Sequence, residues 1–544
     1  MDKELFDDIT ETLPKFNPDI AKGYAVKDMA DSEEYIRRIA ECAAEDFPEG
    51  LEFVNLRLLT PREEFRVLQD TKARNQRRRE IDIAQTDVVM AELKLRFGDQ
   101  TLIRNINIPF MREAGTIYLS GSRATIHPIL ADLVFSVVDN GLFVILFRAK
   151  FTLKRANVSV IRDGESLPAQ IIWGNIYQGK NSAQDKTKGG VFRSSIGHYL
   201  FCKMGVTEVF RKYYNSDIII EEWRPDIREQ YPIEDYVIFQ SQKQAPIHLR
   251  RKPLNDWKPT NLVLIVPRKD VEKYEGVTTL AAHFFYVIDQ YPERFDLRYI
   301  DLPGTWRIVM GFILHKGKEN EGKLLNEVDK HLRSLDSYVD RETRKNFAQE
   351  GIDAEDIYDL FIHVIDTIRD RTQNDDSGNM WGKYLLVKRY ALSGITESIF
   401  NFTWQLEKEK TPLQIKRLNW KLSQMILTNA FMAIQRDHGE LNSVQYPGDC
   451  MIFKHTCIAI RQVNAVTGKK TKSFKANEPA YQLHSSIFEC ASICNFAKGI
   501  PDGRGRLNMT ALTTENGRFI RNPKNIELLD QAQLEIENAT YNKD

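Results

Sequence analysis

A glycine-rich stretch with interleaved arginines holds the residues whose types and spacing most favour contact with a charged partner. It runs from Gly499 to Asn508, contains Arg504 and Arg506, and precedes the turn sequence Glu-Asn-Gly-Arg at 515–518. Glycine lets backbone amides approach another chain or a phosphate closely, and arginine supplies bidentate donors. A surface turn followed by a hairpin explains the same pattern, because Asn-Gly between β-forming residues is a strong turn signal.

A lysine-rich turn near residue 470 is a second candidate for contact with nucleic acid. Its basic residues are Lys469, Lys470, Lys472 and Lys475. A solvated hairpin tip accounts for this turn equally well, since lysines without an aromatic ladder are a weak signal. The basic end of the helix expected at 60–80 has acidic neighbours, which favour a solvated helix face over a binding site.

The sequence contains no arrangement typical of a catalytic or metal centre. Walker phosphate-binding loops, HExxH zinc helices and GxSxG nucleophile elbows do not occur. The ten histidines are scattered, and the six cysteines form no CxxC pair. Asp375 and Asp376 are adjacent, so their side chains diverge, and a turn that ends a helix is the simpler interpretation. We therefore predict no catalytic residue and no metal ligand on this chain.

The composition is that of an ordinary globular protein, with 544 residues of which 42% are hydrophobic and 28% charged. The net charge is zero, whereas a protein that binds nucleic acid through general electrostatics is expected to be basic. Any nucleic-acid contact is therefore expected to be local or shared with partner chains. We find no signal-peptide pattern and no apolar run long enough to cross a bilayer, and the cysteine spacing fits a reducing cytoplasm.

Hydrophobic periodicity predicts a multidomain α+β protein. Helices are expected at 33–45, at 60–80, at 195–214, at 322–346, from Asp353 to about 371, and twice between 381 and 436. Strands are expected at 86–96, 101–120, 217–223, 235–240, 261–267 and 306–314, with a hairpin over 133–155. The clearest internal boundary is the turn-forming stretch 374–378.

One segment resembles a known family closely enough to carry further expectations. Residues 108–123 read Ile-Pro-Phe-Met-Arg-Glu-Ala-Gly-Thr-Ile-Tyr-Leu-Ser-Gly-Ser-Arg. This is similar to a segment of the β subunit of multisubunit DNA-dependent RNA polymerases. The matching motif positions are Pro109, Gly115, Gly121 and Arg123. The family has Asn where this chain has Ser120, and its Glu-Arg pair is reduced to Ser122 and Arg123, an arginine for which the family implies a structural salt bridge.

Three further segments match in the family's order. The stretch 158–169 resembles a β-subunit strand that leads into Leu-Pro-Ala. The residues from Asp375 to Lys383 resemble a motif that precedes a long helix, although the family's His is absent. The fork motif Thr-Pro-Glu-Gly-Pro-Asn-Ile-Gly-Leu-Ile-Asn is represented by Pro501, Gly503 and Asn508, in a stretch about two residues shorter than the family's.

The resemblance implies an RNA polymerase β-like architecture of protrusion, inserted lobe and fork. Residues 1–155 would form the first part of the protrusion, 156–380 the lobe, 381–465 a second, helical part of the protrusion, and 466–544 the fork-like region. The chain would form one wall of the DNA channel, with the fork near the active centre. The candidates for nucleic-acid contact are then Lys469, Lys470, Lys472, Lys475, Arg504 and Arg506.

Catalysis would belong to another chain. In this family an Asp-x-Asp-x-Asp motif on β′ holds the catalytic Mg²⁺ ions, and this chain lacks it. The chain resembles the N-terminal half of the split β subunit of phiKZ-like giant-bacteriophage RNA polymerases. That resemblance implies a hetero-oligomer with a C-terminal β-like subunit, β′-like subunits, template DNA and RNA, and no membrane. It also implies action in the cytoplasm of an infected bacterial host, with packaging in the virion left open.

The alternative is a virion structural or scaffold protein that has a β-like fold and no role in transcription. The two hypotheses differ in their partners, since only a polymerase subunit should purify with chains that bear the aspartate motif.

Overall fold

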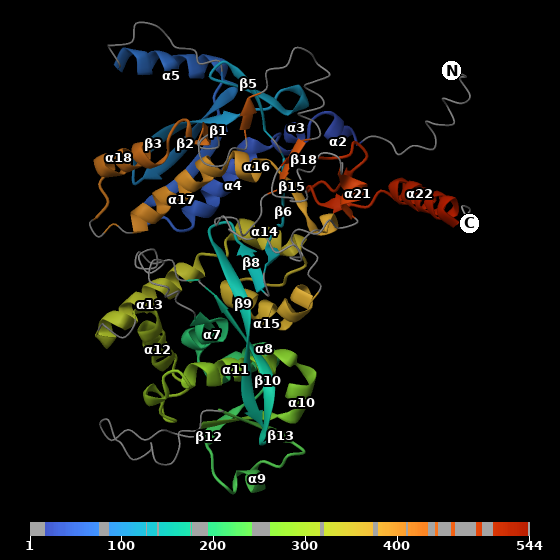
Figure 1. Cartoon of the computed structure of the whole chain (residues 1–544). Coiled ribbons are helices and arrows are strands. Elements are labelled where there is room, and N and C mark those ends of the chain that lie inside the picture. The colour runs from blue at the N-terminus through green and yellow to red at the C-terminus, as the bar shows by residue number, and fades with distance from the viewer. Residues whose placement is uncertain are drawn as a thin grey trace. The chain divides into compact units, whose positions relative to one another are not determined.

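The computed structural model describes residues 17–74, 86–126, 128–138, 141–174, 176, 194–241, 262–315, 320–373, 379–407, 409, 412–432, 441–443, 459–462, 486–491 and 504–541. The chain forms two compact units. Unit 1 comprises residues 1–132 and 376–544, and unit 2 comprises residues 133–375, so unit 2 is an insertion into unit 1 (Figure 1). Helices and antiparallel sheets occur in both units, which confirms the predicted α+β class.

A three-stranded antiparallel sheet forms one layer of unit 1. Its strands, in spatial order, are β1 (Leu51–Leu58), β2 (Val88–Phe97) and β3 (Gln100–Pro109). Helix α4 (Ser32–Ala44) packs against β1, and α17 (Ser393–Glu407) packs against α4. Ile36 and Ile39 on α4 and Leu56 on β1 are fully buried, so the sheet and the helices share an apolar core.

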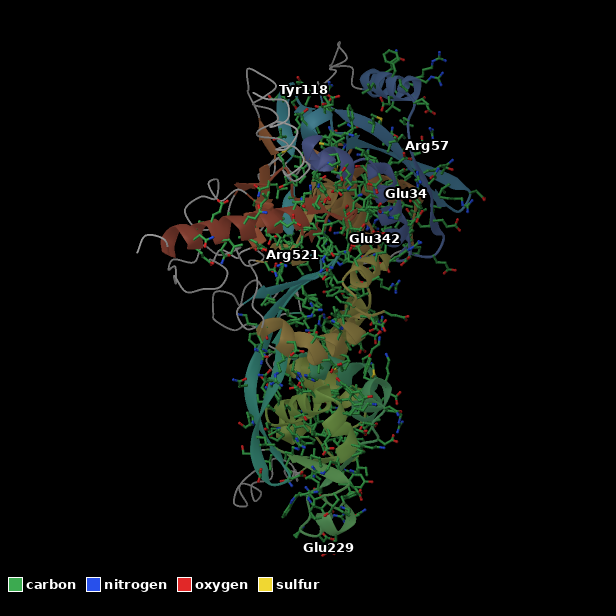
Figure 2. All side chains as sticks on the ribbon, turned by 90° about the vertical axis from the view of Figure 1, so that its right-hand side faces the viewer. Glu34, Arg57, Tyr118, Glu229, Glu342 and Arg521 are labelled. Carbon is green, nitrogen blue, oxygen red and sulfur yellow. The ribbon has the colours of Figure 1, made fainter. Side chains whose placement is uncertain are left out.

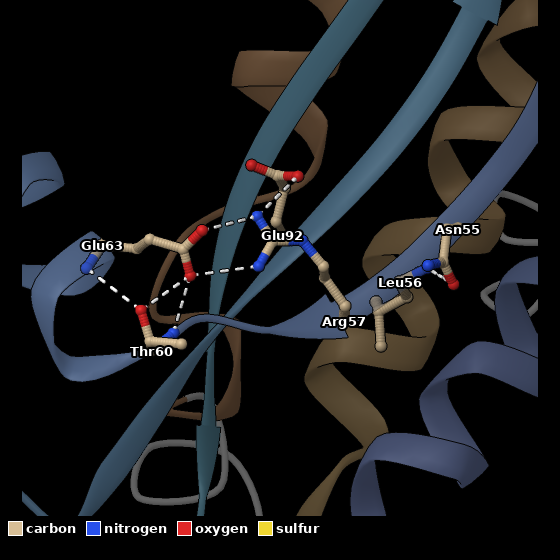
Figure 3. Close-up of polar contacts among 6 residues, drawn as sticks. All are labelled: Asn55, Leu56, Arg57, Thr60, Glu63 and Glu92. Atoms are coloured by element: carbon tan, nitrogen blue, oxygen red, sulfur yellow. Dashed lines mark hydrogen bonds and ion pairs between the residues drawn. The ribbon is translucent and has the colours of Figure 1, made fainter.

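Helix α5 (Pro61–Arg74) begins with a capping box, shown in Figure 3. The Thr60 N–H and hydroxyl both donate to Glu63 Oε2 at 2.9 Å, and the Glu63 N–H donates to Thr60 Oγ1 at 3.4 Å. Arg57 on β1 donates to both oxygens of Glu63 and lies 3.5 Å from Glu92 on β2. The hydrogen bond from Arg57 is the main reason that the pKa of Glu63 falls to about 2. The network therefore ties the start of α5 to the sheet.

Short strands far apart in the sequence complete unit 1. One sheet consists of β16 (Leu441–Ser443), β5 (Ser122–Ile126) and β4 (Thr116–Leu119). A second consists of β15 (Tyr384–Leu386), β6 (Ile129–Ala131), β17 (Ala459–Gln462) and β18 (Arg504–Arg506). A third is the hairpin of β19 (Leu512–Thr513) and β20 (Phe519–Ile520).

The remaining helical segments of unit 1 are short, apart from α18 and α22. They are α2 (Pro18–Ala21), α3 (Tyr24–Asp28), α16 (Lys388–Ala391), α18 (Ile415–Met425), α21 (Ser486–Cys490) and α22 (Pro523–Tyr541), with 3₁₀ turns η1 (Glu113–Gly115), η5 (Met380–Gly382) and η6 (Ala430–Met432).

Unit 2 is built on a larger antiparallel sheet. Its path runs β11 (Ser194–Ser195), β10 (Glu165–Gly174), β9 (Lys150–Arg162), β13 (Tyr236–Gln240), β14 (Leu262–Pro267) and β12 (Ile219–Glu222). The hairpin of β7 (Phe135–Val138) and β8 (Gly141–Ile145) joins this sheet along β9. The helices are α7 (Ile196–Met204), α8 (Val206–Tyr214), α9 (Ile227–Gln230), α10 (Arg268–Lys273), α11 (Glu275–Ile288), α12 (Pro303–His315), α13 (Glu321–Asp336), α14 (Arg341–Gln349) and α15 (Ile357–Gln373).

An aromatic cluster lies at the centre of the helices of unit 2. The fully buried Trp306 ring lies 4.8 Å from the Phe201 ring, 4.8 Å from the Phe295 ring and 5.7 Å from the Phe284 ring, measured between centroids. The indole N–H donates to the Ile300 carbonyl at 2.7 Å, so the buried polar atom is satisfied.

Parts of the sequence prediction for unit 2 are wrong. The strand predicted at 306–314 lies inside helix α12, because an apolar run of this length fits a buried helix as well as a strand. The helix predicted at 195–214 is split at Gly205, whose φ is +90°. The N-terminus of α15 is capped by Asp356, which accepts from two backbone N–H groups at 2.8 Å, and not by Asp353.

Other predicted elements are confirmed only in part. The helix predicted at 322–346 is two helices, α13 and α14, and the strand predicted at 101–120 is β3 and β4 with η1 between them. The helix predicted at 60–80 is described to Arg74, and the two helices predicted between 381 and 436 are α17 and α18. Four strands and a hairpin lie where they are predicted. The strands predicted at 86–96, 217–223, 235–240 and 261–267 are β2, β12, β13 and β14, and the hairpin predicted around Asp139-Asn140-Gly141 is β7–β8. In unit 1, Leu385 lies in β15 and not in the helix predicted there. Unit 2 begins at residue 133 and ends at residue 375, so residues 133–155 belong to it. The assignment of parts of the chain to protrusion, lobe and fork stays a prediction.

Candidate functional site

The motif segment 108–123 forms a hairpin whose turn requires its glycine. Strands β4 and β5 pair from Thr116–Thr125 to Leu119–Ser122, which leaves Ser120 and Gly121 as a two-residue turn. Both turn residues have positive φ, +51° at Ser120 and +82° at Gly121. Glycine adopts this region without steric cost, and Asn tolerates it better than Ser. The motif positions at 120 and 121 therefore have a backbone explanation.

An ion pair at the base of this hairpin connects it to β2. The Arg112 guanidinium donates to both oxygens of Asp87 at 2.7 Å and lies 5.0 Å from the Tyr118 ring centroid. The Tyr118 N–H donates to Asp87 Oδ2 at 2.8 Å. Burial alone would raise the pKa of the Asp87 carboxyl, but these donors hold it below its ordinary value. We did not single out Asp87 from the sequence, since a lone aspartate before a strand carries no signal.

The N-terminal helices pack closely on the same hairpin. Gly23, between α2 and α3, has φ +90°, and a Cβ there would lie 2.5 Å from the backbone of Ala114 and Gly115. The Ala114 N–H donates to the Lys22 carbonyl at 3.1 Å. The close backbone approach therefore requires glycine at position 23. At Gly115 the φ of +67° favours glycine, and a Cβ there would lie 3.3 Å from the Ala25 Cβ.

Arg123 does not show its expected salt bridge within the described residues. Its Nε is buried and has no hydrogen-bond partner there. Its structural role stays a prediction. Pro109 ends strand β3, where the chain turns toward η1.

The second motif, 375–383, lies where the chain returns from the inserted unit, and the structure describes it from Asn379 onward, so Asp375 and Asp376 lie outside the described residues. Asn379 caps η5 by accepting from the Trp381 N–H at 3.0 Å. Lys383 is buried and its ammonium lies 3.1 Å from Asp132 Oδ1, at the other end of the insertion. Strand β15 follows and pairs with β6, with Tyr384 opposite Ala131. The two ends of the insertion therefore meet at one point of unit 1.

The hairpin predicted at 512–520 is confirmed and docks on this second motif. The Phe519 N–H donates to the Lys383 carbonyl at 3.1 Å, and the Leu385 N–H donates to the Gly517 carbonyl at 2.8 Å. Gly517 has φ +83°, and a Cβ there would collide with the Leu385 carbonyl and the Tyr24 hydroxyl. We call the assembly of segments 17–28, 109–126, 379–391 and 507–522 the motif junction.

Asn508 links the motif junction to α21. Its N–H donates to the Cys490 carbonyl at 2.8 Å, and its side-chain amide donates to the Glu489 carbonyl at 3.4 Å. Asn17 fixes the same segment from the other side by donating to the carbonyls of Met509 and Ala511, at 2.7 and 2.8 Å. Asn508, at the end of the predicted fork motif, therefore holds the backbone of α21 in place through two hydrogen bonds.

Two arginines lie against Trp381 in the motif junction. Arg521, labelled in Figure 2, is exposed, and its guanidinium lies 5.5 Å from the Trp381 ring centroid. Arg518 donates to the Trp381 carbonyl at 3.3 Å. Arg521 was not among the candidates from the sequence, because only the fold brings it to Trp381.

Residues 1–531 match the family of non-virion RNA polymerase subunits. The chain belongs to this family. It is a subunit of a bacteriophage RNA polymerase that acts in the infected host cell, and its partners include other polymerase subunits and nucleic acid. The family favours the transcription hypothesis over the virion structural alternative. Among curated proteins, none matches the chain.

The structure describes only some of the predicted nucleic-acid contacts of this polymerase subunit. Residues Lys469, Lys470, Lys472 and Lys475 lie outside the described residues, as do Pro501 and Gly503. The backbone of Arg504 and Arg506 forms β18, at one edge of its sheet, and the register places Arg461 of β17 directly across from Arg504. Two of the six predicted basic positions thus lie on a strand beside the motif junction.

The described part of the polymerase subunit holds no group of three or more His, Cys, Asp or Glu side chains arranged to bind a metal ion. The prediction that the catalytic Mg²⁺ is bound by a partner therefore stays a prediction for the whole chain. No helix among the described residues combines the length and apolar character needed to cross a membrane.

Proposed function

We propose that this polymerase subunit is a noncatalytic, N-terminal β-like subunit that forms one wall of the DNA channel and carries the fork near the active centre. The observation that carries the proposal is the motif junction. The motif segments 109–126 and 379–391, more than 250 residues apart in the sequence, both contact segment 17–28 there. Gly23 lies against the backbone of Ala114 and Gly115, and Asp28 accepts from the N–H groups of Val387 and Lys388. Coincidental motif matches would have no reason to converge in space.

The inserted unit supports the same proposal. A β-like subunit is expected to have a protrusion that is interrupted by a lobe and resumes after it. Here unit 1 is interrupted by residues 133–375, and the chain leaves and re-enters it at the paired strands β6 and β15. Unit 2, which contains most of the proposed lobe (156–380), has its own sheet and its own aromatic core.

Nucleic acid is proposed to contact unit 1 near β17 and β18. The support is the proximity in sequence of Lys469, Lys470, Lys472 and Lys475 to β17, and the arginines at register positions 461 and 504. Because the whole chain has no net charge, binding must depend on such local groups. The Mg²⁺ ions and the aspartates that hold them are proposed to lie on a β′-like partner.

The test is to purify the tagged chain from infected cells and to assay RNA synthesis with and without Mg²⁺. We expect several large partners, one with the Asp-x-Asp-x-Asp motif, and Mg²⁺-dependent RNA synthesis. A photoreactive amino acid at position 506 should then crosslink to nucleic acid in an elongating complex. The same probe at Glu229, an exposed residue of α9 in unit 2, is the control for nonspecific crosslinking.

An active complex in which position 506 crosslinks to protein alone would contradict the fork assignment. The chain would then be an accessory subunit of the polymerase. A chain that purifies without an aspartate-bearing partner would contradict the β-like assignment altogether.

A further inference from the structure

The C-terminal helix α22 presents an apolar stripe to solvent. Every residue from Leu529 to Asn538 is exposed within the described part of the chain. Leu529 is 42% exposed and Ile536 is 67% exposed. These two residues are seven positions apart and so lie on one face of the helix, with Ala532 between them. Such a stripe is typical of a helix that packs against an apolar surface.

The contact of these apolar side chains with water is unfavourable, and a binding partner that covers them would remove it. In proteins, most of the stability of a helix comes from the packing of its apolar face against other parts of the structure. Helix α22 spans Pro523–Tyr541, and its last described turns bury none of their large apolar side chains. Burial of the stripe would remove this apolar surface from water and hold the helix in place.

Charge indicates what kind of surface the helix fits. It carries four acidic residues, Glu527, Asp530, Glu535 and Glu537, and one basic residue, Lys524. Asp530 and Glu537 follow Leu529 and Ile536 by one residue and lie along one border of the stripe, whereas Glu535 lies along the other border. A groove that accepts the helix should therefore have an apolar floor and lysine or arginine on both rims.

The same charges disfavour a second copy of this chain as the occupant. Two such helices side by side would bring like charges together at both borders of the shared stripe. The family already requires other polypeptides in the complex. We propose that α22 docks, as an amphipathic helix, into a basic-rimmed apolar groove on another subunit of the polymerase. This inference requires only membership in a multisubunit polymerase, and it is independent of the β-like assignment.

Two variants test the proposal, one with substitutions in the apolar stripe and one with a control substitution on another face of the helix. In the polymerase assembled from co-expressed subunits, Leu529→Asp combined with Ile536→Asp should reduce co-purification of one subunit at least tenfold. The control is Leu534→Asp, since Leu534 is 58% exposed but lies about 140° around the helix from Leu529. The control should leave the subunit composition unchanged. Both variants should melt at the wild-type temperature as isolated chains, because the replaced side chains are exposed.

A crosslinking experiment identifies the occupant. Benzoylphenylalanine at position 529 of the assembled enzyme should crosslink to another subunit, within a peptide rich in lysine or arginine, and the same probe at position 534 should not. Crosslinks from position 529 to this chain or to a second copy of it would overturn the proposal. So would wild-type composition in the Leu529→Asp, Ile536→Asp enzyme, or equal loss in the Leu534→Asp enzyme.

A charge reversal tests the basic rims. Asp530→Lys combined with Glu537→Lys should lower the retention of the same subunit, and the loss should be larger at low salt than at high salt. Unchanged retention at low salt would overturn the assignment of a basic groove.

Discussion

Lys383 and Asp132 form an ion pair at 3.1 Å although 251 residues separate them in the sequence. The pair closes the base of the inserted unit, beside the strands β6 and β15. The Lys383 side chain is 8% exposed and that of Asp132 is 21% exposed, so neither charge is fully solvated. The pair therefore holds the entry and the exit of the insertion together.

Asp132→Asn should destabilise unit 1 strongly, because it leaves a buried ammonium without its counter-charge. The expected loss is on the order of 3 kcal/mol, and it should be measured by denaturant unfolding with proteolysis to report on unit 1. The control is Glu327→Gln, which removes an exposed ion pair with Lys330 in unit 2 and should cost about 1 kcal/mol or less. Equal stability of the two variants would contradict the proposed role of the buried pair.

Gly121→Ala should lower the stability of unit 1 by about 1 kcal/mol, because residue 121 has φ +82°. Thermal unfolding measures the loss. Gly382→Ala is the matched control, since a Cβ at 382 would meet no atom within 4 Å and its φ is not positive. Ser120→Asn should be neutral or slightly stabilising, because Asn accepts the left-handed region more readily than Ser. A destabilised Ser120→Asn variant would argue against this account of the turn.

Thr60→Ala should loosen the first turn of α5 by about 1 kcal/mol, because it removes half of the capping box. Hydrogen exchange of the amides near Glu63 and Glu64 should become faster, while exchange in β2 should remain close to wild type. Thr60→Ser keeps the hydroxyl and should exchange as the wild type does. Unchanged exchange in Thr60→Ala would mean that the Arg57–Glu63 bond alone holds the helix start.

Acid should destabilise unit 2 through three buried histidines. Burial lowers the pKa of His198 to about 4, of His283 to about 3 and of His331 to about 4. Their folded pKa values lie below the unfolded value near 6.5, so the unfolded state binds more protons between these values. Stability should be insensitive to these groups above pH 7 and should fall as the pH drops from about 6.5 toward 4.

His331→Gln removes one of these groups and should reduce the slope of unfolding free energy against pH. Each titrating proton contributes about 1.4 kcal/mol per pH unit where it is taken up only on unfolding. Denaturant titrations of the wild type and the variant at pH 5, 6 and 8 measure the difference. Identical slopes at pH 5 to 6 would show that His331 is not held neutral in the folded state.

Replacing Lys469, Lys470 and Lys472 by Ala should weaken DNA binding by the assembled polymerase and flatten its salt dependence. Each lost phosphate contact should reduce the slope of log K against log salt by about 0.9. The control replaces Lys269, Lys330 and Lys345 of unit 2, which removes the same charge from other parts of the chain. Filter binding at several salt concentrations measures both slopes. An unchanged slope in the first variant would count against placing this segment at DNA.

Helices, strands and turns can be predicted from the sequence where one local pattern has a single structural explanation. The Asn-Gly turns predicted β7–β8 and β19–β20 correctly, because their backbone requirements are specific. The apolar run 306–314 predicts a strand as readily as a buried helix, and only the packing around Trp306 distinguishes the two.

The motif junction is harder to predict from the sequence, because its contacts join segments that are far apart in the chain. Asp28 accepts from the N–H groups of Val387 and Lys388, some 360 residues later, and no single-sequence pattern predicts such a pairing. Family resemblance located Gly121, Asn508 and the motif ending at Lys383, but it did not reveal Asp87 or Arg521. Those residues act through contacts that only the folded chain creates.

The insertion of unit 2 also sets the order in which the protein can be made. Strand β6 leaves the ribosome long before its neighbour β15, because Lys383 is synthesised 251 residues after Asp132. At about 5–20 residues per second, that interval lasts roughly 10–50 s. Unit 2 is complete within it and can fold while the first half of unit 1 still exposes the surface that the second half will cover. Newly made chains are thus expected to be most vulnerable to aggregation and proteolysis in this interval.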